Sequence, residues 1–158
     1  MNEQKQNMKL FILPSRNKNN KYIELFVNSF SQARSDIEIV PVPNDKLSDV
    51  LRYFLHNRRS KAGEHSVSVV HIHWSTILYG SRFLLKSALL IFWNFLILFF
   101  LKKFFNTRVV WTAHNFYAHD YPHRTIDSIG RFFLLNFADC LIVQEKRTLS
   151  EYRKKYPR

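Results

Sequence analysis

Apolar residues follow two alternating patterns along the chain. Short runs rich in β-branched and aromatic residues, typical of buried strands, alternate with stretches in which apolar residues return every three or four positions, as on one face of a helix. Strands are predicted at residues 8–13, 37–42, 67–74, 108–112 and 138–143, and helices at residues 22–33, 45–56, 83–105, 125–137 and 145–156. This alternation predicts an α/β fold: one Rossmann-like parallel sheet of about five strands with helices on both faces.

Individual residues refine these elements. Pro41 cannot donate a ladder hydrogen bond, so the second strand is expected at an edge of the sheet. In the fourth predicted helix, Ile126, Ile129, Phe133 and Leu134 fall in phase, which predicts one buried face.

Several classes of site are disfavoured by composition and motifs. The polar loop at residues 14–21 is not glycine-rich, so neither a P-loop nor a dinucleotide fingerprint is present. The only cysteine, Cys140, permits no internal disulfide and fits a reducing compartment; its place in an apolar strand predicts an inert, buried thiol. The polar residues at 1–10 lack the apolar core of a secretory signal.

The charge is strongly basic. The chain has 24 Lys and Arg against 12 Asp and Glu, a net charge of +12, which suits a polyanionic partner: nucleic acid or anionic lipid. Basic residues gather at 58–61, 102–103 and 153–155, but no helix-turn-helix, RNA-binding signature or zinc finger accompanies them. Because the central pair flanks a very apolar segment, we expect a membrane surface rather than nucleic acid as the partner.

That apolar segment, residues 83–105, connects the third and fourth strands. It carries no charge from Ser87 to Leu101, and a spanning helix needs about 20 apolar residues. A span would place the two strands on opposite sides of the bilayer, so we expect a helix or helix pair lying in one leaflet, peripheral or monotopic, at the cytoplasmic face of the cell membrane. A buried core helix, an oligomer interface and a true span are the alternatives. The predicted membrane contacts are Arg82, Lys86, Trp93, Lys102 and Lys103.

Polar, titratable residues follow directly on two of the predicted strands. The fourth strand ends in His114, Asn115, Tyr117, His119 and Asp120. The third contains His71 and His73, which share one face because side chains alternate along a strand, and closes with Trp74. Since ligands of α/β sheets bind at the carboxyl ends of the strands, these residues predict a site at that edge.

Each of these residues has two interpretations, a chemical role and a purely structural one. Asp120 and His114 are candidates for a general base; alternatively, Asp120 caps the next segment and His114 satisfies buried backbone groups. The spacing of His71 and His73 occurs in metal sites, but no carboxylate joins them in a known ligand pattern, so no metal is expected. No G-x-S-x-G motif is present, which disfavours a serine hydrolase.

Taken in order, these motifs resemble a known family. The sequence VVHIHW at residues 69–74, the apolar crossover, VVWTAHNFYAHD at 109–120 and ADCLIVQEKRTLSEY at 138–152 are similar to the N-terminal domain of GT-B fold glycosyltransferases. The nearest resemblance is to bacterial enzymes that extend lipid-linked exopolysaccharide units. The family's first loop usually carries Asn-Pro-Tyr, where this chain has Asn20, Lys21 and Tyr22.

The resemblance implies that residues 1–158 form the acceptor-binding domain of such an enzyme. A sugar would pass from a nucleotide-sugar donor to a polyprenyl-linked glycan in cell-surface polysaccharide synthesis, with no cofactor. Asp120 or His114 would act as base or orient the acceptor. The acceptor-binding residues would be Asn20, Tyr22, His73, Trp74, Asn115 and His119.

The family binds its donor in a second Rossmann-like domain, which we expect to be absent from this chain. Transfer would then need a further domain or a partner chain, as in the split N-acetylglucosaminyltransferase of the dolichol pathway. The alternative is a non-catalytic subunit that anchors a donor-binding partner at the membrane, and a basic nucleic-acid-binding domain is a third, less favoured hypothesis.

Overall fold

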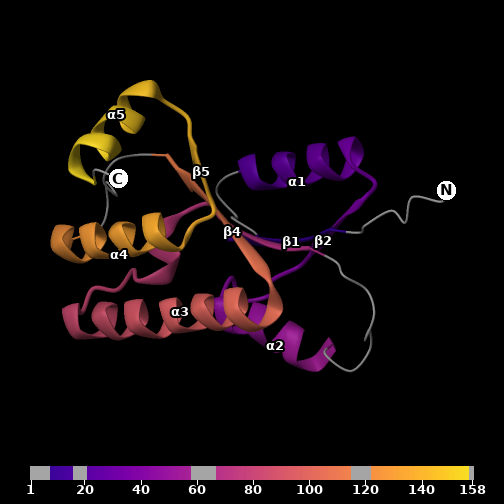
Figure 1. Ribbon diagram of the computed structural model, residues 1–158, viewed down its shortest axis with the longest axis horizontal. Coiled ribbons are helices and arrows are strands. Elements are labelled where there is room, and N and C mark those ends of the chain that lie inside the picture. Colours follow the sequence, from indigo (N-terminus) through magenta and orange to yellow (C-terminus); the bar gives the residue numbers. More distant parts are fainter. Residues whose placement is uncertain (1–7, 16–20, 58–66, 115–121, 157–158) are drawn as a thin grey trace.

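The computed structural model describes residues 8–15, 21–57, 67–114 and 122–156 (Figure 1). Strands and helices alternate, as the sequence predicts. The strands are β1 (Met8–Leu13), β2 (Ile37–Val40), β3 (Ser68–Ile72), β4 (Thr107–Ala113) and β5 (Cys140–Val143). The helices are α1 (Tyr22–Ala33), α2 (Leu47–Asn57), the short 3₁₀ helix η1 (Ser75–Leu78), α3 (Leu84–Phe105), α4 (Arg124–Phe137) and α5 (Lys146–Lys155).

All described strand pairs are parallel, in the order β2-β1-β3-β4-β5. The prediction of a Rossmann-like parallel sheet of five strands is therefore confirmed, as is the edge position of β2. The chain moves outward from β1 to β2 and then returns past β1 to β3. The β1–β3 neighbourhood is thus the topological switch point, where open α/β sheets bind ligands outside the carboxyl ends of their strands.

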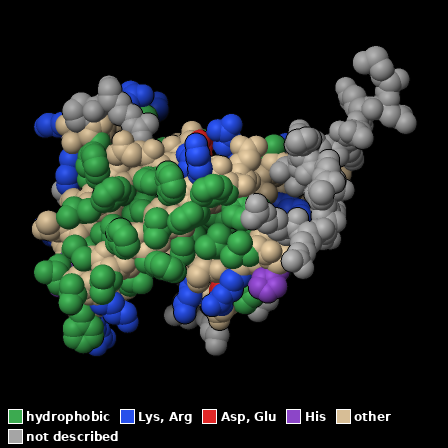
Figure 2. All heavy atoms as spheres, turned by 60° about the horizontal axis from the view of Figure 1, so that its bottom comes forward, with side chains coloured by type: hydrophobic (Ala, Val, Ile, Leu, Met, Phe, Trp, Pro, Cys, Tyr) green, Lys and Arg blue, Asp and Glu red, His purple; other side chains and the backbone are tan. Residues whose placement is uncertain are grey.

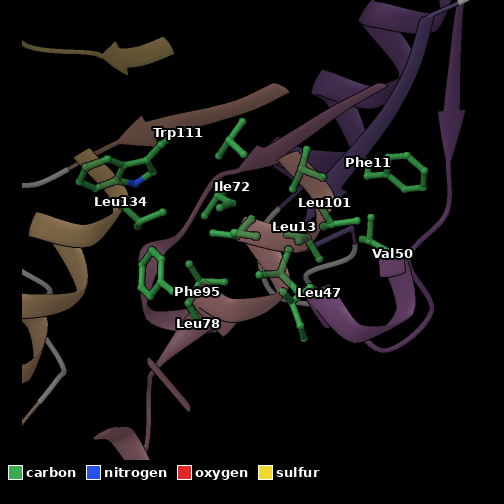
Figure 3. Close-up of a cluster of buried hydrophobic side chains, with 14 of the residues drawn as sticks. Phe11, Leu13, Leu47, Val50, Ile72, Leu78, Phe95, Leu101, Trp111 and Leu134 are labelled. Carbon is green, nitrogen blue, oxygen red and sulfur yellow. The ribbon is translucent and has the colours of Figure 1, made fainter. Parts of the chain in front are cut away.

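Helices cover both faces of the sheet. Helix α1 lies on one face, and α2 and α3 lie on the other (Figure 1). Beneath α1 is a small apolar cluster that includes Leu10, Ile12 and Ile23. The larger core fills the opposite face, where residues of β1, β3 and β4 meet α2, α3 and α4 around Leu13, Ile72 and other buried side chains (Figure 3).

Helix α3 is the crossover that joins β3 to β4. Its inward residues Ile91, Phe95, Leu98 and Leu101 recur at helical spacing and are buried against the sheet. The polar residue Asn94 also has an internal role, because its side-chain amide donates to the carbonyl of Leu78 at 2.6 Å. The helix has one buried face and is not enclosed on all sides.

The length and composition of α3 would allow it to cross a membrane. In this fold, however, β3 and β4 are hydrogen-bonded neighbours from Ser68 and Thr107 to Ile72 and Trp111. A span would have to separate these two strands. Helix α3 ends at Phe105, and the next residue, Asn106, has a left-handed backbone (φ 47°) that returns the chain directly into β4.

Two predictions from apolar periodicity are wrong. Cys140 lies in β5 as expected, but its side chain is exposed, because β5 is an edge strand and Cys140 is on its α1 side. On α4, Ile129 and Phe133 are exposed, although they fall in phase with the buried Ile126 and Leu134. The apolar surface of α4 is wider than the face that the sheet covers.

Candidate functional site

Four aromatic rings from three segments meet at the carboxyl edge of the sheet. Tyr22 opens α1, which follows β1; His73 and Trp74 follow β3; His114 follows β4. Because β1, β3 and β4 are adjacent and parallel, these segments emerge side by side at the switch point. We call Tyr22, His73, Trp74 and His114 the ring cluster.

The imidazole of His73 lies at the centre of this cluster. The ring of Tyr22 stacks on it, with centroids 5.0 Å apart and planes inclined by 23°. Trp74 meets it edge-on at 5.0 Å, and His114 lies 4.2 Å away. His73 is 2% exposed, whereas Tyr22 is 42% exposed, so the cluster has a buried centre and an accessible rim.

A hydrogen-bond chain runs through the two histidines. Nε2 of His73 lies 2.7 Å from Nε2 of His114, and Nδ1 of His114 lies 3.0 Å from Oε1 of Gln144. Two nitrogens sharing a tetrahedral zinc ion would stand about 3.3 Å apart, given Zn–N bonds of about 2.0 Å. The observed approach is therefore that of a hydrogen bond. In the described part of the chain, no group of three or more metal-ligating side chains is assembled.

Two histidines of β3 and the residue after it, His71 and His73, are neutral at physiological pH. Burial, reinforced by repulsion from His114, lowers the pKa of His73 to about 3 and that of His71 to about 4. His71 lies one step deeper on the same strand face and pairs its Nε2 with Oγ1 of Thr112 at 2.8 Å. His71 is thus a hydrogen-bonded core residue, while His73 belongs to the edge.

The structure brings together four of the predicted site residues: Tyr22, His73, Trp74 and His114. The other four lie outside the described residues, and their predicted roles stay predictions. They are Asn20, Asn115, His119 and Asp120.

Sequence reasoning missed Gln144 as a member of the site. Its signal is the strand register: Ala113 pairs with Val143, so the residues that follow, His114 and Gln144, emerge side by side. A polar residue directly after an apolar strand, opposite a candidate histidine, was the pattern available in the sequence.

A second buried polar cluster, which the sequence interpretation also missed, starts in the segment that follows Trp74. The hydroxyl of Tyr79 donates to Oδ1 of Asp127 at 2.6 Å, and Nε of Arg131 donates to Oδ2 of Asp127 at 2.9 Å. Nη1 of Arg131 also donates to the hydroxyl of Tyr152 at 2.6 Å. Together with Ser75, whose Oγ lies 3.0 Å from the hydroxyl of Tyr79, these buried residues form what we call the ionic network. It ties η1 and the segment after it to α4 and α5.

Gly130 makes this network possible. A Cβ at this position would lie 2.3 Å from the buried ring of Tyr79. The absence of a side chain therefore lets Tyr79 lie against α4 and reach Asp127, one turn earlier on the helix.

The outward surfaces of α3 and α4 form one broad apolar face. Figure 2 shows hydrophobic side chains gathered over much of this side of the molecule, with Lys and Arg around their margin. The exposed residues that form this apolar face are Phe83, Leu84, Leu85, Leu89, Phe92, Trp93, Phe99, Phe100 and Phe104 from the α3 segment and Ile129, Phe132 and Phe133 from α4.

The predicted membrane contacts are distributed unevenly over this face. Trp93 is 54% exposed within it, and Arg82, Lys86 and Lys103 are exposed beside it. Lys102 instead binds within the protein: its Nζ donates to the carbonyl of Phe137 at 2.6 Å and to Asp139 at 3.0 Å. A lipid contact of Lys102 stays a prediction.

Comparisons with known proteins leave the family open. No family model matches the chain, and no curated protein or solved structure matches it either. What is established is therefore the fold, a Rossmann-like parallel α/β sheet with alternating helices and one long apolar helix.

Proposed function

We propose that this chain is the acceptor-binding half of a glycosyltransferase that works at the cytoplasmic face of a membrane. The reaction would move a sugar from a nucleotide-sugar donor to a lipid-linked glycan in cell-surface polysaccharide synthesis. The observation that carries the proposal is the ring cluster at the β1–β3 switch point, on a domain whose α3 and α4 expose a broad apolar face.

The ring cluster suits a carbohydrate. Trp74 and Tyr22 offer flat apolar surfaces with polar tips, which can pack against the C–H faces of a sugar ring. The imidazoles of His73 and His114 are hydrogen-bonding groups, and the low pKa of His73 keeps that ring uncharged. A few convergent polar groups among aromatic side chains are typical of a small-molecule binding site.

The apolar face suits a lipid surface. A helix surface with exposed Trp, Phe and Leu and flanking Lys and Arg can sit at the boundary of headgroups and acyl chains. The basic residues beside the face and the net charge of +12 favour anionic lipid over a second copy of this equally basic chain. Docking by this face would hold the switch point close to the lipid that carries the glycan.

The donor would bind to a further domain or a partner chain, as the GT-B resemblance implies. Asp120 remains the proposed base, with His114 as the alternative. Both ring nitrogens of His114 are already engaged, by His73 and by Gln144. This favours Asp120 over His114 as the group that deprotonates the acceptor.

A second candidate function is a non-catalytic anchoring subunit. It is favoured because both ring nitrogens of His114 already have hydrogen-bond partners, which leaves neither free to act as a base. A transfer assay with the donor-binding chain and a lipid-linked glycan separates the two. If the chain carries the base, Asp120→Asn abolishes transfer while the fold is retained. Unchanged turnover in Asp120→Asn would support the anchoring subunit and remove the base assignment.

Membrane docking is tested by flotation of the full chain with vesicles of anionic phospholipid. Leu85→Ser with Phe92→Ser removes two of the most exposed apolar residues, which are 74% and 69% exposed, and should weaken binding at least about tenfold. Leu55→Ser is the matched control, because Leu55 is 53% exposed on α2. Equal loss in both variants, or none in either, would contradict docking by the apolar face.

A further inference from the structure

The hydrogen-bond chain of the ring cluster has a direction. Oε1 of Gln144 can only accept, so Nδ1 of His114 must carry the proton in the bond that joins them. When the ring of His114 holds one proton, its Nε2 has a lone pair. The bond of 2.7 Å between the two Nε2 atoms then requires the proton to lie on Nε2 of His73.

This direction leaves one atom unsatisfied. With its proton on Nε2, His73 has a lone pair on Nδ1, and that buried atom has no hydrogen-bond partner among the described residues. Buried polar side-chain atoms are nearly always paired, so such an exception calls for an explanation. The ionic network nearby shows that this domain can satisfy buried polar groups fully, for instance at Asp127.

The geometry points to a ligand site at this atom: Gln144 and His114 fix the tautomer of His73, so that Nδ1 of His73 is a permanent, uncharged acceptor for a hydroxyl group of a bound ligand. The chemical class is a neutral, hydroxyl-rich molecule. The identification of this molecule as the sugar of a glycan acceptor rests on the proposed function. The direction of the hydrogen-bond chain is independent of that function.

Nδ1 of His73, as a hydrogen-bond acceptor, discriminates between ligand classes. A phosphate or carboxylate oxygen would meet the lone pair of Nδ1 with lone pairs of its own, whereas a sugar hydroxyl donates a hydrogen bond. His73 is not assigned as the base, because an imidazole whose pKa is about 3 takes up a proton poorly at neutral pH. It binds and orients the hydroxyl, and Gln144 and His114 are positioning residues.

The atom is enclosed, so a ligand reaches it only when neighbouring side chains shift. We expect Tyr22 to be the one that moves, since its ring stacks on His73 and is 42% exposed. Stacking of a sugar on the displaced ring would replace the contact that is lost.

The test is ¹⁵N NMR of the histidine rings in the full chain, with the apolar face covered by detergent micelles. Protonated and unprotonated ring nitrogens are distinguished by their shifts. The expected result is a protonated Nε2 and an unprotonated Nδ1 for His73, and the reverse for His114. His56 is an internal reference, because its Nδ1 lies 2.9 Å from the carbonyl of Arg52 and must be the protonated nitrogen.

Two variants of Gln144 examine its positioning role. Gln144→Glu keeps an accepting oxygen, so Nδ1 of His114 should stay protonated. Gln144→Met removes it, and the Nδ1 signal of His73 should lose its purely unprotonated shift. A protonated Nδ1 of His73 in the unaltered chain, or tautomers indifferent to Gln144→Met, would overturn the inference while leaving sugar transfer untouched.

The ligand class is tested by adding a methyl hexoside or inorganic sulfate, each alone at the same concentration. The hexoside should shift the Nδ1 resonance of His73, and sulfate, which has no proton to donate, should not. A shift with sulfate alone would overturn the neutral ligand. A third outcome is that the tautomers are as predicted, but neither the hexoside nor a lipid-linked glycan shifts the resonance. This would overturn the proposed function and the ligand site together.

Discussion

Two buried polar clusters flank the short segment from His73 to Tyr79, and they are built in opposite ways. The ionic network contains a carboxylate and a guanidinium, and both oxygens of Asp127 accept hydrogen bonds. The ring cluster contains no carboxylate or guanidinium; its central imidazole, His73, is neutral, and one nitrogen of that ring has no described partner. The first cluster joins η1 and the segment after it to α4 and α5; the second lies where the strands end.

This difference distinguishes a cluster that stabilises the fold from a cluster that binds a ligand. A buried charge that lost its partner would cost several kcal/mol, so loss of one partner in the ionic network should strongly destabilise the domain. An unpaired neutral imidazole nitrogen costs less, about 1–3 kcal/mol, and can be kept where a ligand supplies the partner. The account predicts that the ionic network governs stability and the ring cluster governs binding.

The largest effect is expected from breaking the ionic network. Asp127→Ala leaves Arg131 buried without its carboxylate, and the free energy of unfolding should fall by about 3–5 kcal/mol. Denaturant unfolding of the two proteins measures this. Glu151→Ala is the control, because its ion pair with Arg147 is exposed and should contribute less than about 1 kcal/mol. Similar losses in both variants would erase the distinction between the two ion pairs.

Acid should destabilise the domain through its buried histidines, of which His71 is the clearest case. The folded pKa of His71 is about 4, below the unfolded value of about 6.5, so the unfolded chain binds more protons between these values. Stability is therefore full above about pH 6.5 and falls toward pH 4 by about 1.4 kcal/mol per unit for each such histidine. Unfolding measured against pH should flatten in His71→Gln; a curve identical to that of the unaltered chain would refute the neutral buried state of His71.

Gly130→Ala should destabilise the domain by a smaller amount. Alanine is the better helix former by about 1 kcal/mol, yet its Cβ would lie 2.3 Å from the ring of Tyr79. We expect a net loss of about 1–3 kcal/mol from overpacking. Tyr79→Leu should remove most of this penalty, and a double-mutant cycle of thermal unfolding measures the coupling. Additive effects on the free energy of unfolding would show that the ring of Tyr79 moves aside without loss of stability.

The smallest effect on stability is expected in the ring cluster itself. His114 is half-buried, so His114→Ala should change the free energy of unfolding by no more than about 1 kcal/mol. The same substitution should abolish the ordered tautomer of His73. A loss of stability as large as that of Asp127→Ala would instead make the ring cluster structural.

The sequence predicted the α/β class and most of the ring cluster because both depend on local patterns. Strand runs, helical spacing and polar residues after strands can be read from neighbouring positions. His73 and His114 were thus expected at one edge, where the structure places them 4.2 Å apart, centroid to centroid.

The rest depends on contacts between distant segments. Gln144 joins His114 only through the register of β4 with β5, and Tyr79 reaches Asp127 only because Gly130 leaves room. The exposure of Cys140 follows from the edge position of β5, which periodicity does not reveal.

In the proposed function, the ring cluster receives a glycan carried on a membrane lipid. The most direct measurement is the affinity of the full chain for anionic vesicles that contain polyprenyl-diphosphate-linked glycan, compared with vesicles that contain the same lipid without sugar. The account predicts tighter binding to the glycan-bearing vesicles, and loss of only that difference in Trp74→Ala. Equal affinity for both kinds of vesicle would contradict it.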